Sequence, residues 1–538
     1  MKINYTVKLK TPALTASLGI IGKDIDVVVK VDSKGKPFFN GKHIKGILKE
    51  RVTQFKLGLG ESEDATKEFI DKYFGKEGNY IKDNNFDKIR FSNLVLVDEN
   101  NYNIDDRYGI KIDRKTRTTV HNSLFRYEHI TAGTEFKGDI EVPNKIDRED
   151  LKFILACLFH LDTIGGFKSR GIGKVDLFIK GRELKYKENE DIIDNIISEI
   201  LQSNNEDSKA NLNGKLKKYS YILSLKEPFI LTGREIGNYV EVRDSIQGST
   251  IRGAMIEHFI SSKDIPLEEL ICIEASDAIS GDISLASKFI TKYAINGDKI
   301  ETDKIVDSRN EIEDKSKGKG VKLERKGTSM LKAKGNEISI AINSQTKSVE
   351  DGMLFNSEYL QCDEKLIGDI VLPEGLVDEN KEYTIYLGKM KSKGFGKAVI
   401  TFGKYEKERA NLKARIEKLQ KQANEKILTF DLQSDLILPF NTIYNVGEQF
   451  KALVGISELK FEENKSYINT GKLGGYNIIN NIRKVDELVI TRGSVLTYKI
   501  DDFNSILPKL EEIEEKGLGL RKNEGFGRVK ISSERGEK

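Results

Sequence analysis

The sequence predicts an α+β protein made of tandem copies of one small unit, and three observations support this class. A chain of 538 residues is too long for a single hydrophobic core, and its length suggests roughly three to four domains of about 100–200 residues. Its 32% charged and 38% hydrophobic residues are typical of a globular chain rather than a disordered or membrane one. The third and most informative observation is an internal repeat.

The repeat is clearest between residues 123–143, SLFRYEHITAGTEFKGDIEVP, and residues 353–373, MLFNSEYLQCDEKLIGDIVLP. The two segments align without gaps and share a Leu-Phe pair, a glutamate, a Gly-Asp-Ile triplet and a final proline. A weaker third copy is VITRGSVLTYKI, residues 489–500. This pattern indicates duplication of one structural unit.

A glycine loop of one type follows each copy. It has a basic residue, then the motif G-[I/F]-G-[K/R], and then a β-branched strand. The loops are GGFKSRGIGKV (165–175), GKMKSKGFGKAV (388–399) and GLRKNEGFGRVKI (519–531). Two copies also share a helix start, FNGKHIKGILKERV (39–52) and IQGSTIRGAMIEHF (246–259). No convincing third start is found around Val454 and Gly455.

Within a copy, the pattern predicts a strand, a glycine turn, a helix, two strands, an apolar helix (151–161 in the first copy), the glycine loop and a last strand. A β-α-β-β-α-β order folds as a ferredoxin-like, RRM-like sandwich, which is also a platform for single-stranded RNA. The predicted organisation is domain 1 at 1–182, a linker at 183–216, domain 2 at 217–404 with an insertion at about 262–345, a helical linker at 405–426 and domain 3 at 427–538.

The glycine loops suggest phosphate binding, because missing Cβ atoms let a backbone approach closely and neighbouring cations add charge. The alternative is a plain tight turn that needs positive φ; three basic copies favour phosphate. A dinucleotide-binding loop is followed by a helix, whereas each of these loops is followed by a strand. The sequence also lacks the G-x-x-x-x-G-K-[ST] motif, which argues against an ATPase. The candidate RNA-binding residues are Lys168, Arg170, Gly171, Gly173, Lys174, Lys391, Lys393, Gly394, Gly396, Lys397, Arg521, Lys522, Gly525, Gly527 and Arg528.

The helix starts are the second candidate, since free N–H groups and the helix dipole attract phosphate there. Net charge gives no separate support, because it is only +3. For Ser249 and Thr250 the alternative to phosphate binding is simple N-capping of the helix, and both roles can coexist. The residues are Lys42, His43, Lys45, Ser249, Thr250 and Arg252.

Three widely spaced cysteines, Cys157, Cys272 and Cys362, predict a reducing compartment with neither disulfides nor a structural zinc site. No apolar run reaches the length of a membrane span, and no signal-peptide core follows the N-terminus. We therefore expect a cytoplasmic protein without membrane contact.

These motifs together resemble the RAMP superfamily of CRISPR-associated proteins, whose marks are a glycine-rich loop before the last strand and an early I-x-G-S-x-[IL]-[KR]-G turn. Residues 1–182 resemble the RNA-cleaving backbone subunit of type III effectors, with a thumb region at 110–140. Residues 217–538 resemble the subtype III-D RAMP protein, so the chain looks like a natural fusion. The resemblance implies binding of crRNA, complementary target RNA, further RAMP subunits and the large polymerase-like subunit.

The resemblance implies that, in active relatives, an aspartate ahead of a G-x-P-[YF] segment cleaves target RNA with a divalent metal. Here that segment is GKPFF (35–39), and Asp26 is the candidate for catalysis and for binding Mg²⁺ or Mn²⁺, with Asp24 as runner-up. The alternative is that both lie on the solvated face of a strand. If His43 were instead a general acid–base, the chain would be a ribonuclease that processes crRNA precursors. A non-catalytic scaffold subunit is the third hypothesis.

Overall fold

The computed structural model describes residues 1–18, 25–32, 34–75, 88–179, 182–183, 193–199, 214–237, 239–243, 245–280, 290–296, 299–301, 306–307, 324–325, 333–342, 349–361, 363, 365–404, 412–439, 444–477 and 482–532. Three separate clusters of buried apolar side chains lie within residues 3–197, 219–402 and 412–531. These clusters define domains 1, 2 and 3 below.

Domain 1 contains a sheet with the strand order β9-β1-β8-β4, in which all neighbours are antiparallel. In chain order these are the fourth, first, third and second strands, which is the ferredoxin-like arrangement. In β1, alternate residues face the core, because successive side chains of a strand point to opposite sides. The elements are β1 (Lys2–Leu9), α1 (Gly41–Gly58), α2 (Glu63–Phe74), β4 (Arg90–Phe91), β5 (Val95–Leu96), β8 (Glu135–Glu141), α3 (Arg148–Phe159), β9 (Val175–Ile179) and β10 (Arg182–Glu183).

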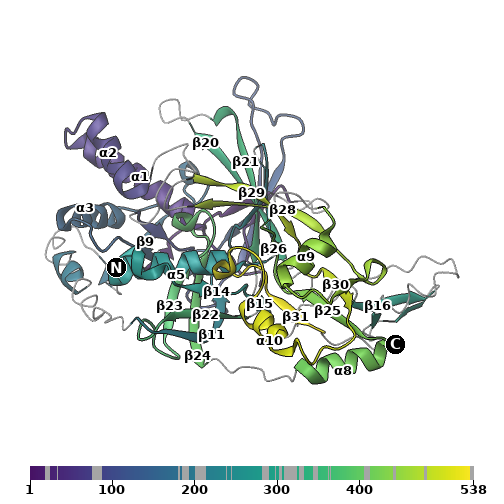
Figure 1. Ribbon diagram of the computed structural model, residues 1–538. Helices are drawn as coiled ribbons and strands as arrows, with labels where there is room; N and C mark the ends of the chain where they lie inside the picture. The colour runs from purple at the N-terminus through teal and green to yellow at the C-terminus, as the bar shows by residue number, and fades with distance from the viewer. Residues whose placement is uncertain are drawn as a thin grey trace.

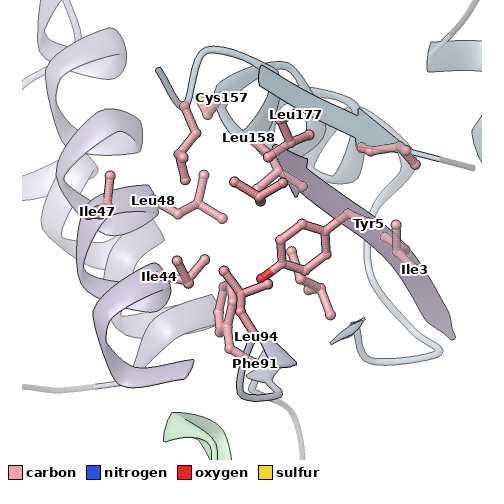
Figure 2. Close-up of a cluster of buried hydrophobic side chains, with 14 of the residues drawn as sticks. Ile3, Tyr5, Ile44, Ile47, Leu48, Phe91, Leu94, Cys157, Leu158 and Leu177 are labelled. Atoms are coloured by element: carbon pink, nitrogen blue, oxygen red, sulfur yellow. The ribbon is translucent and has the colours of Figure 1, made fainter. Parts of the chain in front are cut away.

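The domain 1 core lies between this sheet and its helices. Figure 2 shows Ile44 and Leu48 of α1 pointing toward Tyr5 of β1, with Leu158 of α3 beside Leu177 of β9. Ile44 and Leu48 lie four residues apart on one helix face and are fully buried. Burial of each such side chain contributes roughly 1.5–3 kcal/mol, so this packing fixes the position of the α1 start.

Domain 2 repeats the order as β24-β11-β22-β14, with β23 added at the edge beside β24. Residues 374–396 are all described, and they hold strand β23 where domain 1 has helix α3, so the expected second helix is wrong for this copy. The elements are β11 (Leu216–Leu225), α5 (Gly248–Lys263), α6 (Leu267–Leu270), β14 (Glu274–Ala275), β15 (Ile279–Ser280), β22 (Leu366–Pro373), β23 (Glu382–Tyr386) and β24 (Lys397–Lys404).

Domain 3 has the order β31-β25-β30-β27 and both helices of the unit. Its first helix follows Asn445 and includes Gly447 and the fully buried Phe450, so the expectation that this copy lacks a helix start is wrong. The sequence VGEQFKALV keeps only the glycine and the apolar spacing of the other two starts. The elements are α8 (Leu412–Ala423), β25 (Ile427–Leu432), α9 (Val446–Val454), β27 (Lys460–Phe461), β30 (Val495–Lys499), α10 (Leu507–Lys516) and β31 (Val529–Ile531).

Each domain also carries a second, smaller sheet built around a hairpin, and Figure 1 shows β20–β21 and β28–β29 on the same side of the molecule. These hairpins correspond to the expected thumbs. The sheets comprise β2 (Ala16–Leu18), β3 (Val27–Val29), β6 (Ile104–Gly109) and β7 (Phe125–Ile130) in domain 1, β12 (Thr232–Ile236), β13 (Tyr239–Val242), β20 (Ala333–Ile342) and β21 (Val349–Gln361) in domain 2, and β26 (Leu436–Ile437), β28 (Thr470–Asn477) and β29 (Ile482–Ile490) in domain 3.

Segments expected to be linkers or insertions contribute to the domain cores. Residues 193–199 are helical, and Ile193, Ile196 and Ile197 pack in the domain 1 core. Leu412 and Ile416 of α8 pack in the domain 3 core. Strand β14 lies inside the expected insertion yet supplies the second strand of the domain 2 sheet. Strands β15 and β20 also lie inside it and pair with β22 and β21 of domain 2. A separate sheet is formed by β16 (Ile290–Asn296), β17 (Lys299–Glu301), β18 (Val306–Asp307) and β19 (Glu324–Arg325).

Candidate nucleic-acid interface

The three glycine loops adopt one conformation. Each is a single 3-10 turn, preceded by a left-handed non-glycine residue and closed by a left-handed glycine, with φ of +77° at Gly171, +84° at Gly394 and +88° at Gly525. The second glycine passes close to its own domain: a Cβ on Gly173 would lie 2.0 Å from the Ile164 carbonyl oxygen. Gly396 and Gly527 are equally confined, by Leu387 and Leu518. Local backbone geometry therefore accounts for both glycines of the motif.

The second loop is buried against domain 1. Ser392 Oγ accepts a 2.8 Å hydrogen bond from Lys45 Nζ, and the Gly394 carbonyl accepts one of 2.9 Å from Asn93 Nδ2. Asn93 Oδ1 in turn accepts from the Gly41 amide at the start of α1. The loop residue Lys393 is half-buried. An RNA phosphate could reach this loop only if the junction of domains 1 and 2 opened.

The lysines of the second loop are already paired inside this junction. Lys391 forms an ion pair with Glu257 of α5, which also pairs with Arg90 of domain 1. Lys397 pairs with Asp139 of β8. Lys391 and Lys397 are 7% and 9% exposed, so neither presents its charge to solvent.

The third loop meets the start of α5 in the same way. A Cβ on Gly525 would lie 2.7 Å from the Ala275 carbonyl oxygen and 3.2 Å from Asp277 Oδ1. Asp277 Oδ1 accepts a 2.8 Å hydrogen bond from the Gly248 amide, as Asn93 does from Gly41. Burial raises the pKa of Asp277 to about 7.

The cations of the third loop differ in their surroundings. Arg521 is engaged by Glu487 of β29 and by Glu524 of its own loop. Lys522 is exposed, and Arg528 is half-buried.

The first loop is open. Lys168, Arg170, Gly171 and Lys174 are all exposed. The Arg170 guanidinium lies 4.5 Å from the ring centre of Phe167 and 5.8 Å from that of Phe125 in β7. This loop therefore forms one surface with the base of the domain 1 hairpin.

The helix-start residues are mostly committed to protein contacts. Lys42 Nζ lies 3.6 Å from Glu337 Oε1 of β20, and Lys30 Nζ lies 2.5 Å from the other oxygen of that carboxylate. Burial lowers the pKa of Lys42 despite this attraction. Arg252 donates to the Ile273 and Ile271 carbonyl oxygens at 2.6 Å each.

Ser249 and Thr250 are half-buried in the first turn of α5. The N-cap residue of this helix is Gln247, and it makes no side-chain capping bond. The expected capping role of Ser249 and Thr250 is therefore not found, because both lie inside the helix rather than at its cap.

His43 fixes the first glycine loop to the helix start. Its Nε2 accepts a 2.7 Å hydrogen bond from the Gly165 amide, and its ring stacks on Phe39. Burial, followed by the charge of Lys168, lowers the pKa of His43 to about 4. A neutral ring whose acceptor nitrogen is occupied serves a structural contact, and this geometry gives no support to general acid–base work.

The candidate residues predicted from the sequence do not include an exposed basic segment, the turn that joins β6 to β7. Apolar side chains of this turn are exposed as well, with Ile110 at 52%, Ile112 at 57% and Leu124 at 64%, and the neighbouring Tyr108 of β6 is 63% exposed. The signal in the sequence was the dense alternation IKIDRKTRTT. The exposed cations of β6 and this turn are Arg107, Lys111, Arg114, Lys115 and Arg117.

The tip of this hairpin is ordered by Asp113. Its Oδ1 accepts hydrogen bonds from the Lys115 and Thr116 amides at 2.8 and 2.9 Å. These bonds lower the pKa of Asp113, with the Thr116 amide contributing most. The carboxylate thus stays charged while it fixes the backbone of the tip.

Asp26 lies exposed at the base of the same hairpin. Its Oδ2 accepts a 2.8 Å hydrogen bond from the Arg126 amide in β7, and its own amide donates to the Arg126 carbonyl. Arg126 Nε donates to Asp106 of β6 at 2.6 Å. Asp24 lies outside the described residues.

A metal at Asp26 can be judged from its neighbours. Within the described part of the chain, no three His, Cys, Asp or Glu side chains are grouped so that they could hold an ion. One exposed carboxylate still fits Mg²⁺, which commonly keeps water ligands and uses one or two carboxylates together with substrate phosphates.

No helix among the described residues is long and apolar enough to cross a bilayer. Cys157 is buried and Cys272 is exposed, and both are free thiols.

Comparison with known proteins gives one family. No curated protein sequence matches the chain. Among solved structures, one chain of the Type III-B Cmr-beta complex bound to cognate target RNA is 12% identical with a TM-score of 0.31, covering 55% of this chain and 89% of that chain. A chain of the same complex with target RNA and AMPPnP is 14% identical with a TM-score of 0.31, covering 55% and 88%. Residues 6–176, which carry the ferredoxin-like sheet of domain 1, match the model of the RAMP superfamily, and domain 1 therefore belongs to that superfamily.

Proposed function

We propose that the chain is an RNA-binding backbone subunit of a type III CRISPR effector, in which the successive domains follow a crRNA that pairs with target RNA. Domain 1 is its backbone-like part, and residues 217–538 are a fused part of the subtype III-D kind. The observation that carries the proposal is the exposed basic hairpin of domain 1, on a domain of the RAMP superfamily.

The chemistry of this hairpin suits a nucleic acid. Guanidinium and ammonium groups pair with backbone phosphates and release counterions, which supplies sequence-independent affinity. Exposed apolar side chains such as Tyr108 and Ile112 offer surfaces on which bases can stack or pack. A protein that contacts backbone and shape leaves the reading of sequence to base pairing, as in other guided effectors.

The hairpins of the other domains support an extended path. β20–β21 and β28–β29 lie together on one side of the molecule (Figure 1). Contacts between domains also hold them in place: Glu337 of β20 pairs with Lys30 of domain 1, and the Gly474 carbonyl of β28 accepts from Arg243 of domain 2. A strand of RNA could therefore meet successive hairpins in a fixed order.

Charge reversal at the hairpin tip tests RNA binding. Arg114→Glu, Lys115→Glu and Arg117→Glu together should weaken binding of single-stranded guide RNA by at least about tenfold and reduce the salt slope of log Kd by about 2. The matched control reverses three exposed lysines elsewhere, at Lys67, Lys137 and Lys426. Filter binding at several salt concentrations measures both. Equal affinities for the two triple variants would contradict the proposal.

We extend the proposal to cleavage of target RNA at Asp26. Held by Asp26 together with RNA phosphate oxygens, Mg²⁺ or Mn²⁺ would stabilise negative charge at the scissile phosphate. The Arg126 amide orients the carboxylate, and the basic hairpin holds the strand beside it.

The same preparation tests this extension. With guide, complementary RNA and Mg²⁺ or Mn²⁺, Asp26→Asn should abolish cleavage and keep RNA affinity, while Asp105→Asn on the exposed face of β6 should cut as the wild type does. Cleavage by Asp26→Asn at the wild-type rate would remove the catalytic role and leave the binding role intact.

A further inference from the structure

The junction between domains occurs twice in this chain with the same parts. We number the three glycine loops in chain order as loops 1, 2 and 3. In the first junction, Gly394 of loop 2 contacts the start of α1, where Asn93 hydrogen-bonds to both Gly394 and Gly41. In the second, Gly525 of loop 3 sits on the start of α5, where Asp277 binds Gly248. We call these receiving surfaces socket 1 (Gly41, Lys45 and Asn93) and socket 2 (Gly248 and Asp277).

Contact distances show how tightly the sockets close on the loops. A Cβ on Gly394 would lie 2.1 Å from Asn93 Oδ1 and 2.9 Å from the Gly41 amide nitrogen. A Cβ on Gly525 would lie 3.2 Å from the Gly248 Cα. A Cβ on Gly171, at the corresponding position of loop 1, meets nothing within 4 Å. Loop 1 therefore has the conformation of a docked loop and meets no socket among the described residues.

Loop 1 also keeps the chemistry of the loop that docks. Lys168, Ser169, Arg170 and Gly171 repeat the sequence of residues 391–394 with one Lys-to-Arg change, and Lys174 repeats Lys397. In loop 2, Lys391 is held by Glu257 of α5, and Glu50 occupies the corresponding position on α1. Lys168 is exposed, whereas Lys391 is 7% exposed.

In the described part of the chain, the start of α9, the first helix of the domain 3 unit, does not form such a socket. In domain 3, the side of Gly447 that faces a loop in the other domains is covered by its own Phe461, whose ring lies 2.3 Å from a Cβ built there. Asn93 and Asp277 each lie two residues after the second strand of their domain. The corresponding residue of domain 3, two residues after β27, is Glu463. The described residues of a second copy of this chain therefore offer no open socket to loop 1.

We infer that loop 1, residues 167–171, is a docking element for a separate ferredoxin-like subunit, and that it binds the start of that subunit's first helix. The partner would present a glycine at this start, an Asn or Asp after its second strand, and a Lys or Arg four residues into the helix, as socket 1 does. This inference rests on the proposed function. It adds a direction of assembly, because the next subunit would bind at the domain 1 end of the chain. A guide RNA phosphate at loop 1 is the competing outcome.

Site-specific photo-crosslinking in the native complex tests the inference. The full chain, tagged at its C-terminus and expressed in its own cells, carries p-benzoylphenylalanine at Ser169, the counterpart of Ser392, or at Lys115 in the hairpin. Ser392 contacts Lys45 of socket 1, so the Ser169 probe should crosslink to a peptide from the first helix start of another subunit. The Lys115 probe should crosslink to RNA.

The two probes separate the possible failures. A crosslink from position 169 to RNA alone, to a peptide without a helix-start glycine, or to nothing would overturn the docking inference while the Lys115 probe still supports RNA binding. A Lys115 probe that finds no RNA counts against the proposed function, whatever position 169 contacts.

A single methyl group provides the matched variant. Gly171→Ala has open space in the chain alone but would clash in a socket that closes as socket 1 does, so it should reduce the crosslinked subunit in the purified complex at least about tenfold. Gly60→Ala is the control, since Gly60 also has positive φ and open space. Equal amounts of partner with both variants would overturn the inference.

Discussion

His43 occupies the first turn of α1, where its Nε2 accepts a hydrogen bond from the Gly165 amide. Burial lowers its pKa from 6.5 to about 4 in the folded protein. Because the unfolded chain binds the proton at higher pH, this contribution to stability is present above pH 6.5 and is lost as the pH falls toward 4. At pH 5 the expected loss is about 2 kcal/mol relative to pH 7.

Urea unfolding of the wild type and of His43→Gln at pH 7 and pH 5 measures this loss. Glutamine can accept the Gly165 hydrogen bond but does not titrate, so the variant should lack this part of the pH dependence. If both proteins lose the same stability between the two pH values, His43 is not a buried neutral ring.

At the scale of elements, α8 shows that a charged helix can belong to a core. Leu412, Ile416 and Leu419 form a buried stripe along it, and Arg415 pairs with Glu514 of α10 at 2.6 Å. Ile416→Ala should therefore lower the free energy of unfolding of domain 3 by roughly 2–5 kcal/mol. Lys421→Ala, on the exposed face, should change it by less than about 0.5 kcal/mol. Urea titration decides; a neutral Ile416→Ala would mean that α8 is a linker.

At the scale of the whole molecule, a buried ion cluster joins domains 1 and 2. Glu257 binds both Arg90 and Lys391, and all three side chains are at most 12% exposed. Glu257→Gln removes the carboxylate of Lys391 and leaves Arg90 with only the longer 3.9 Å pair to Glu141. Breaking a buried ion pair typically costs about 3–5 kcal/mol. We expect faster amide hydrogen exchange at residues 41–48 and 391–397, which face each other across this junction.

Glu50→Gln is the control for this change, because Glu50 holds the corresponding position on α1 and is exposed. It should leave exchange at both segments unchanged. Equal exchange in the two variants would show that the cluster does not hold the junction closed.

The sequence by itself determined the unit and its number. Apolar alternation in residues 2–9, the helix periodicity after Gly41 and the repeated glycine loops follow from local rules of strands, helices and turns. The structure confirms the ferredoxin-like strand order in all three domains, although β23 replaces the second helix in domain 2. The third helix start was missed, because VGEQFKALV keeps the spacing but few of the residue types. The hairpin was expected as a thumb, yet its cations were not singled out.

Only the tertiary structure decided which copies of a motif remain available to a ligand. Loops 1 and 2 have nearly the same residues, and their local conformation is the same. Yet Lys168 faces solvent while Lys391 is buried against Glu257. Exposure depends on which domain packs against a loop, and that contact joins residues hundreds of positions apart, so no local pattern encodes it.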